Sequence, residues 1–215
     1  MSSKRPEDDY DAAPFVPDGA DLAALREAAA GCRGCPLHEN ATQTVFGEGD
    51  ASARVVLVGE QPGDQEDRKG HPFVGPAGRI LNQALEEAGI DPGETYVTNA
   101  VKHFKFTQTP ERGKRRIHKQ PSLREMTACG PWLAAETALL DPEVTVALGA
   151  SAGKALLGSS FRVSRQRGIL LEREDASPLL ATLHPSAVLR AGDDRDAVYA
   201  GVVSDLRVVA RALGG

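Results

Sequence analysis

The pattern of apolar and polar positions along this chain predicts strands and helices in alternation. Stretches rich in β-branched residues are typical of strands buried on both faces, and they lie at 54–59, 95–100, 144–148 and 179–183. Apolar residues at helical spacing predict helices at 21–30, 75–90, 122–140 with a break near Gly130 and Pro131, 152–157 and 194–213. This order indicates an α/β fold, a three-layer α/β/α sandwich around a four-stranded parallel sheet.

Length and composition place the chain in an ordinary class. With 215 residues, 41% of them hydrophobic and 26% charged, we expect one globular domain at 19–215. Residues 1–18 are polar and contain three prolines, which predicts a disordered acidic tail. There is no apolar run of membrane-spanning length, and the start has no signal-peptide pattern. We therefore expect a cytoplasmic, bacterial-type protein, and a monomer, because no apolar heptad is evident.

The distribution of charge is more informative than the net charge of −5. Residues 101–124 carry eight Lys and Arg side chains against one acid, Glu111. A basic segment on a mildly acidic protein is compatible with a DNA contact confined to one face, and a solvated charged loop is the alternative. The polar stretch 101–121 is also long for a structureless loop in a compact domain, which favours a functional role.

Three loops with unusual content follow predicted strands. They lie at 60–67, 99–118 and 184–186, and each is rich in acid, amide or histidine side chains. Ligands of open α/β sheets bind at the carboxyl ends of the strands, so the three loops predict one shared site, although each alone would pass as an ordinary turn. The stretch 149–154 is not a phosphate-binding loop, because its glycine spacing is one residue too short and Ala155 follows its lysine.

The cysteines suggest a metal site. Cys32 and Cys35 have the spacing of ligands for zinc or an iron–sulfur cluster, but one such pair is a weak signal because these sites need four ligands. Cys129 is the third cysteine of the chain. A structural disulfide is disfavoured in the cytosol.

Four motifs in this order resemble those of the iron–sulfur uracil-DNA glycosylases of families 4 and 5. They read GEQPG at 59–63, HPFVGPAG at 71–78, TNAVK at 98–102 and LHPS at 183–186. The basic stretch KRRIH at 114–118 is similar to the insertion that marks the UdgX subgroup. The resemblance runs from about Cys32 to the C-terminus and implies the fold of that family.

The resemblance also implies a [4Fe-4S] cluster and its ligands. Those would be Cys32, Cys35, His103 and Cys129. His103 departs from the family 4 pattern, which has a cysteine at this position, and an imidazole on cluster iron is chemically allowed. A zinc ion is the alternative that this ligand set permits.

The family pattern further implies how uracil would be read. A glycosylase extrudes its base from the helix, so the flipped ring needs an aromatic surface, for which Phe73 is the candidate. The amide of Asn99 can donate to uracil O4 and accept from N3–H. Gly59 and the segment from Gln61 to Asp64 would complete the uracil pocket. His184 would then stabilise the uracil anion as a hydrogen-bond donor.

The UdgX-like insertion implies covalent capture of DNA. His118 would attack the C1′ cation, Glu60 would fix the imidazole tautomer or stabilise the cation, and Arg116 would hold the loop. The expected partner is uracil-containing DNA, single- or double-stranded, and the protein would lie on the nucleoid when bound. Expected DNA contacts are Lys102, Lys114, Arg115, Lys119, Ser186 and Arg190. Two alternatives are a conventional glycosylase that uses water and a non-catalytic uracil-DNA-binding module.

Overall fold

The core of the protein is a six-stranded mixed sheet with the strand order β1-β3-β2-β6-β8-β7. The computed structural model describes residues 10–108, 115–174 and 176–214. Strands β3, β2, β6 and β8 are parallel neighbours, whereas β1 and β7 pair antiparallel at the two edges. The strands are β1 Glu48–Gly49, β2 Val55–Gly59, β3 Thr95–Asn99, β6 Val144–Leu148, β7 Leu170–Arg173 and β8 Ala176–Thr182.

The four predicted strands are the four parallel strands of this sheet, which confirms the predicted α/β sandwich. The expectation of only four strands is wrong at the edges. The sequence gives little signal for β1, which has two residues, or for β7, which contains no fully buried residue. Edge strands are open to solvent on one side, so they need no continuous apolar run.

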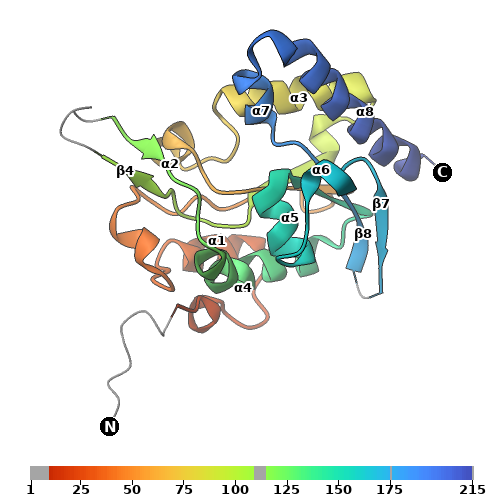
Figure 1. Ribbon diagram of the computed structural model, residues 1–215. Helices are drawn as coiled ribbons and strands as arrows, with labels where there is room; N and C mark the ends of the chain where they lie inside the picture. Colours follow the sequence, from red (N-terminus) through yellow and green to blue (C-terminus); the bar gives the residue numbers. More distant parts are fainter. Residues whose placement is uncertain (1–9, 109–114, 175, 215) are drawn as a thin grey trace.

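Helices cover both faces of the sheet. Helices α3 (Pro76–Ala88), α7 (Pro185–Arg190) and α8 (Arg195–Leu213) gather at the top of Figure 1, and α1 (Leu22–Ala29) and α4 (Leu123–Leu140) lie at the bottom. Helix α5 (Gly149–Leu157) contacts α4. Alternate residues of β2 serve the two layers, because Val55 and Leu57 pack with α3 and α8 while Val56 and Val58 pack with α4 and α5.

Helix α4 is continuous where we expected a break. Pro131 lies inside the helix, and the residues beside it, Cys129, Trp132 and Leu133, are buried. A proline inside a helix costs about 3 kcal/mol. Burial of two large apolar side chains within one turn offsets that cost, since each contributes roughly 1.5–3 kcal/mol.

The described part of the N-terminal segment is ordered against the protein, which corrects the predicted disorder for residues 10–18. Ala12 is only 2% exposed, and its N–H donates to the Ala128 carbonyl of α4 over 2.9 Å. A 3-10 helix follows at Ala13–Phe15. Residues 1–9 of the predicted tail lie outside the described residues.

The long loop after β3 also has regular structure. Strands β4 (Phe106–Thr107) and β5 (Ile117–His118) pair antiparallel, with Phe106 opposite His118. Further short elements were not predicted: α2 Asp64–Lys69, α6 Val163–Gln166, and 3-10 helices at Pro36–Glu39, Pro92–Glu94 and Gly192–Asp194. The β4–β5 ribbon stands beside the main sheet near α2 (Figure 1).

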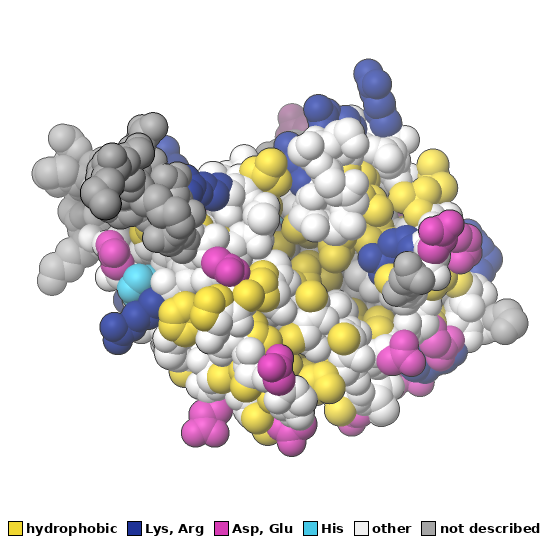
Figure 2. All heavy atoms as spheres, turned by 90° about the horizontal axis from the view of Figure 1, so that it is seen from below, with side chains coloured by type: hydrophobic (Ala, Val, Ile, Leu, Met, Phe, Trp, Pro, Cys, Tyr) yellow, Lys and Arg dark blue, Asp and Glu magenta, His cyan; other side chains and the backbone are white. Residues whose placement is uncertain are grey.

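The lower face of the molecule has a partly apolar surface. Figure 2 shows hydrophobic side chains across the middle of this face and charged side chains mainly around its edge. Leu123 and Leu139 of α4 are 50% and 44% exposed. Within the described residues, no helix is long and apolar enough to cross a membrane.

Candidate active site

A cavity of about 590 Å³ opens at the carboxyl ends of the four parallel strands. Glu60 follows β2, Asn99 ends β3, Gly149 follows β6 and His184 follows β8. The remaining lining residues are Gln61, Pro62, Gly63, Glu66, Phe73, Ala77, His118, Gln120, Leu148, Ala150, Ser151, Ser186 and Arg190. The structure thus brings the three predicted loops to one site, as the rule for parallel sheets requires.

Phe73 and Asn99 form a slot in this cavity, and Gly59 makes room for both. A Cβ atom on Gly59 would lie 2.3 Å from Asn99 Oδ1 and 2.8 Å from Phe73 Cζ. Phe73 has a φ of 53°, which is rare for an aromatic residue and marks a constrained backbone. Its ring stacks near His184, with centroids 6.1 Å apart and planes 25° apart. Gly59 itself is behind the slot rather than on the cavity surface.

The backbone of Phe73 is fixed by a close approach of helix α3, which gives a first testable expectation. A Cβ atom on Gly78 would lie 1.6 Å from the Phe73 carbonyl oxygen. Gly78→Ala should therefore displace the Phe73 loop and lower the free energy of unfolding by about 1–3 kcal/mol or more. Urea denaturation measures this loss. Gly130→Ala is the control, because that helical site has open space, and it should be neutral or slightly stabilising.

His184 is held as a neutral imidazole with one defined tautomer. Its Nδ1 accepts from the Ser186 backbone N–H over 3.1 Å and lies 2.8 Å from Ser186 Oγ. Burial lowers the pKa of His184 to about 4, and the nearby Arg190 and His118 act in the same direction. Because Nδ1 accepts, the hydrogen of the neutral ring is on Nε2. His184 can therefore donate a hydrogen bond from Nε2.

The lowered pKa of His184 predicts a stability that depends on pH. The unfolded histidine has a pKa near 6.5, so the unfolded chain takes up the proton first, and stability is lost as the pH falls from about 6.5 towards 4. At pH 5 this linkage amounts to about 2 kcal/mol. Urea denaturation measures the free energy of unfolding at pH 7 and at pH 5. The decrease between the two pH values should be smaller in His184→Asn than in wild type by this amount. Equal drops in both proteins would contradict the assignment.

His118 lies at the cavity between an acid and an amide. Its Nε2 is 3.3 Å from Glu60 Oε1 and 2.9 Å from Gln61 Nε2. Burial lowers the pKa of His118, while Glu60 opposes that shift. The side chain is nevertheless 51% exposed. This arrangement presents a neutral imidazole, able to act as a nucleophile or a base, to anything bound in the cavity.

The Gln61 side chain holds the ribbon that carries His118 rather than facing the slot. Its Oε1 accepts from the Lys105 N–H over 3.0 Å, and its Nε2 donates to the carbonyls of Lys119 (2.9 Å) and Lys105 (3.2 Å). One amide therefore ties both strands of the β4–β5 ribbon to the loop after β2. Because the Gln61 side chain is engaged in this way, only its backbone and the adjacent loop remain available for the predicted contact with uracil.

Arg116 anchors the same ribbon through carboxylates outside the cavity. It forms ion pairs with Asp64 and Asp67, the latter at 2.5 Å, and its guanidinium lies over the rings of Phe104 and Phe106. Its side chain is only 8% exposed. Arg116 and Asp64 therefore pair at helix α2, and neither lines the cavity. Burial raises the pKa of Asp64, but its hydrogen bonds with Arg68 and Arg116 outweigh burial and lower the pKa below its usual value. The sequence predicted that Arg116 would hold the loop against phosphates or the pocket wall, whereas its ion pairs here are with the acids of α2.

The basic segment contributes fewer surface charges than its sequence suggests. Lys102, expected to bind DNA, is 1% exposed and pairs with the buried Glu136, so that prediction is wrong. Lys105 pairs with Glu125 over 2.7 Å. Arg115 and Lys119 are exposed, and Lys114 lies outside the described residues. Arg190, also exposed, donates to Ser186 Oγ at the cavity over 2.9 Å.

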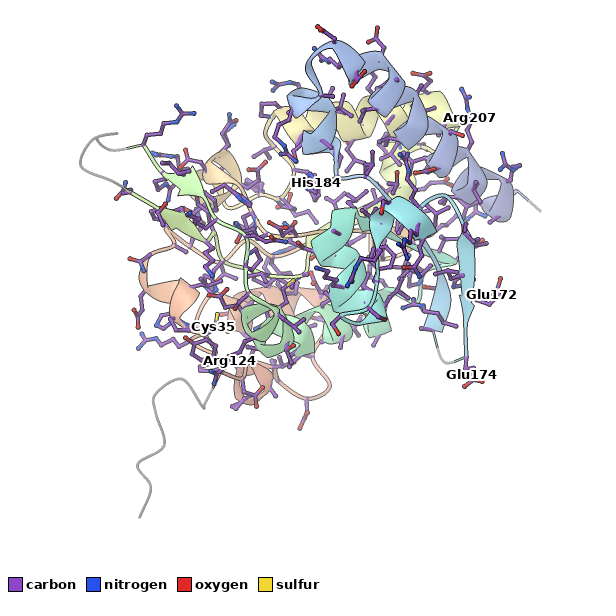
Figure 3. The ribbon with its side chains drawn as sticks, viewed as in Figure 1. Cys35, Arg124, Glu172, Glu174, His184 and Arg207 are labelled. Atoms are coloured by element: carbon purple, nitrogen blue, oxygen red, sulfur yellow. The ribbon has the colours of Figure 1, made fainter. Side chains whose placement is uncertain are left out.

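The three cysteines lie together on the other side of the sheet from α7. Cys32, Cys35 and Cys129 are unpaired and belong to one buried cluster with Trp132. Figure 3 shows Cys35 near α1 and α4, well apart from His184. Trp132 Nε1 donates to Cys32 Sγ over 3.2 Å, and the Lys102 N–H donates to Cys129 Sγ over 3.4 Å. The cysteine site is therefore separate from the cavity.

The chemistry of this donor set fits a cluster of the expected kind. Burial raises the pKa of Cys129 to about 12, so the thiol keeps its proton at neutral pH unless a bound metal stabilises the thiolate. His103 is buried and directly follows Lys102, whose N–H donates to Cys129, and the His103 Nε2 lies 3.1 Å from Thr44 Oγ1. Burial lowers the pKa of His103 to about 4, which keeps the ring neutral, as a ligand must be. Among the described residues no three such side chains are already arranged around a metal position.

Several cavity residues were missed by the sequence reasoning. Glu66 lines the cavity from α2, and its Oε1 accepts from the Gly75 N–H over 2.9 Å. Ser151, in the turn after β6, contacts Glu60, and Gln120 contacts Ser151. A signal was available for Ser151, because every loop after a parallel strand reaches this edge.

Comparison with known proteins identifies the family to which this fold and cavity belong. The fold and cavity define the class as an α/β sandwich with its ligand site at the carboxyl edge of a parallel sheet. Residues 46–207 match the Uracil DNA glycosylase superfamily. The chain therefore belongs to the uracil DNA glycosylase superfamily.

Individual relatives agree with this family. The Type-4 uracil-DNA glycosylase of Thermotoga maritima is 38% identical over 160 residues, which are 74% of this chain and 78% of that protein. That of Pyrobaculum aerophilum is 36% identical over 177 residues, 79% of this chain and 85% of that protein. A DNA polymerase of Bacillus phage SP01 is 31% identical over 180 residues, which cover 83% of this chain but only 18% of the polymerase.

Proposed function

We propose that this protein excises uracil from DNA and that His118 then forms a covalent bond to the deoxyribose C1′, as in a UdgX-type uracil-DNA glycosylase. The family and the similar Type-4 uracil-DNA glycosylases support the excision. The observation that carries the covalent step is the position of His118. A neutral imidazole lines the cavity beside Glu60, on a ribbon held by Gln61 and Arg116.

Recognition of uracil uses the slot between Phe73 and Asn99. The base leaves the helix stack and lies against Phe73, and such stacking contributes about 1–3 kcal/mol. The Asn99 side chain donates to O4 and accepts from N3–H, which distinguishes uracil from cytosine. Backbone groups of the loop from Gln61 to Gly63, which line the cavity, complete the pocket.

Cleavage breaks the bond between C1′ and uracil N1. The electron pair leaves with the base, so uracil departs as an anion and the sugar becomes a cation. His184, with its hydrogen on Nε2, donates to O2 of the departing anion. Donation from a neutral imidazole stabilises charge that is present only as the bond breaks.

Capture follows when a lone pair of the His118 imidazole forms a bond to C1′. The ring then carries a positive charge and loses its remaining N–H proton, for which Glu60 is the adjacent acceptor. The uracil anion gains one proton from the solvent, so the protons balance. Fixed geometry gives His118 a large effective concentration relative to water. The product lacks a readily protonated leaving group and persists, so each protein molecule acts once.

Contacts to DNA are proposed for residues of the basic segment and of helix α7. Arg115, Lys119 and Arg190 provide charge, Ser186 provides a hydroxyl, and Lys114 is proposed from its sequence position alone. The partner is uracil-containing DNA, single- or double-stranded, and the protein acts as a monomer in the bacterial cytoplasm, on the nucleoid when bound.

The cysteine site is proposed to hold a [4Fe-4S] cluster. Cys32, Cys35 and Cys129 provide three thiolates, and His103 provides the fourth ligand. Such a cluster would tie the segment after α1 to helix α4 and to the start of the long loop. The N–H groups of Trp132 and Lys102 donate to two of the sulfurs and stabilise their negative charge.

A denaturing gel tests the proposed function. Purified protein is mixed with a labelled single-stranded oligonucleotide that contains one uracil, and a thymine oligonucleotide serves as control. We expect a heat- and detergent-stable shift with uracil alone, together with free uracil equal to the protein in amount. Alkali-labile sites in excess over protein, without a shift, would show a conventional glycosylase. Tight binding without free uracil would show a binding module.

A further inference from the structure

Ser151 is a buried hydroxyl on the cavity wall, in the first turn of α5, and it has a partner on each side. Gln120 Nε2 donates to Ser151 Oγ over 2.8 Å, and Ser151 Oγ donates to Glu60 Oε2. Only 2% of Ser151 is exposed. Because an amide N–H can only donate, the hydroxyl accepts from Gln120 and directs its own hydrogen at Glu60.

This hydrogen bond leaves Glu60 one carboxylate oxygen for His118. Glu60 Oε1 is 3.3 Å from His118 Nε2, while Oε2 is occupied by Ser151. The terminal torsion of a glutamate is broad, so without such a bond the carboxylate plane is poorly defined. The contact with Ser151 therefore selects the orientation in which Oε1 faces the imidazole.

Two neighbours of His118 favour opposite tautomers. Glu60 is an acceptor and favours a hydrogen on His118 Nε2, whereas Gln61 Nε2, 2.9 Å from the same nitrogen, is a donor and favours a bare one. The two hydrogens of the Gln61 amide already have acceptors in the carbonyls of Lys119 and Lys105. The orientation of Glu60 therefore decides which tautomer of His118 predominates.

We propose that Ser151 is a positioning residue that sets the tautomer of His118 by holding the Glu60 carboxylate with Oε1 towards the imidazole. The hydrogen then lies on Nε2, between His118 and Glu60. Ser151 does not touch the DNA in this scheme and acts only through Glu60. The consequence for capture rests on the proposed function, but the tautomer itself does not.

Nitrogen NMR of the ring tests the tautomer without DNA. Ring nitrogen shifts of His118 are measured at pH 7.5 in wild type, Ser151→Ala and Ser151→Thr, with His118→Ala for assignment. We expect the Nε2–H form to predominate in wild type, to lose population in Ser151→Ala, and to recover in Ser151→Thr, which keeps the hydroxyl. Unchanged shifts in a folded Ser151→Ala protein would overturn the proposal.

The rate of adduct formation tests the consequence. Ser151→Ala should slow single-turnover capture about tenfold, the effect of losing one hydrogen bond to a charged group, with a smaller effect on release of free uracil. Should Ser151→Ala fail to fold, Ser151→Cys replaces the hydroxyl by a thiol, which is a weak donor, and should shift the tautomer in the same direction. An unchanged tautomer in that variant would overturn the proposal. A wild type without adduct would contradict the proposed function, while the NMR result would still decide the role of Ser151.

Discussion

Substitution of His118 by alanine is expected to abolish the denaturation-resistant complex with uracil-containing DNA. The substitution removes the only nucleophile that we place at C1′ but leaves Phe73, Asn99 and His184 on the cavity wall. Water can enter the vacated space, so slow excision with release of an abasic site should continue. The gel measures the adduct, and alkali treatment of the same samples measures the abasic sites.

The matched control for this experiment is His71→Ala. His71 is also a half-exposed histidine beside a glutamate, since its Nδ1 lies 2.5 Å from Glu48 Oε1, but it does not line the cavity. This variant should form the adduct at the wild-type rate. A stable shift that persisted in His118→Ala would mean that another side chain is the nucleophile, and the assignment of the ribbon would be wrong.

Substitution of Lys102 by methionine is expected to destabilise the protein by about 3–5 kcal/mol, because it leaves a buried carboxylate without its counterion. The side chains of Lys102 and Glu136 are 1% and 0% exposed. Glu136 also accepts from the Gly47 N–H, the Tyr96 hydroxyl and the Thr98 hydroxyl. Lys102 Nζ donates to the Asn99 carbonyl over 2.9 Å, so the loss should also loosen the end of β3 that presents Asn99.

An exposed ion pair provides the comparison for Lys102. Arg54 pairs with Glu143 over 2.5 Å, with side chains 36% and 52% exposed, and it also donates to the Leu213 carbonyl over 2.6 Å. Water screens this exposed pair, so Arg54→Met should destabilise the protein much less than Lys102→Met. Urea denaturation measures both losses. The double variant Lys102→Met, Glu136→Gln should recover part of the stability, because no unpaired charge is left. Equal losses in Lys102→Met and Arg54→Met would contradict the buried-pair argument.

The sequence predicted the elements whose signal is local. A strand covered on both faces needs a continuous apolar run, and all four parallel strands were predicted within a few residues. The carboxyl edge followed from the same rule, and with it the meeting of Glu60, Asn99 and His184. The edge strands β1 and β7 were missed because exposure on one side leaves no such run. The break at Pro131 was wrong because buried neighbours outweigh a local preference.

The roles of charged side chains depended on partners far away in the sequence. Lys102 reads as part of a basic DNA-binding segment, yet Glu136, 34 positions away, makes it internal. Arg116 finds Asp64 and Asp67 on α2, 52 and 49 positions away. The sequence by itself therefore determined the sheet, the edge where the site lies and the types of residue available there. Only the tertiary structure decided which of them face the cavity, since a side chain of either charge is buried or exposed according to the partner that the fold brings to it.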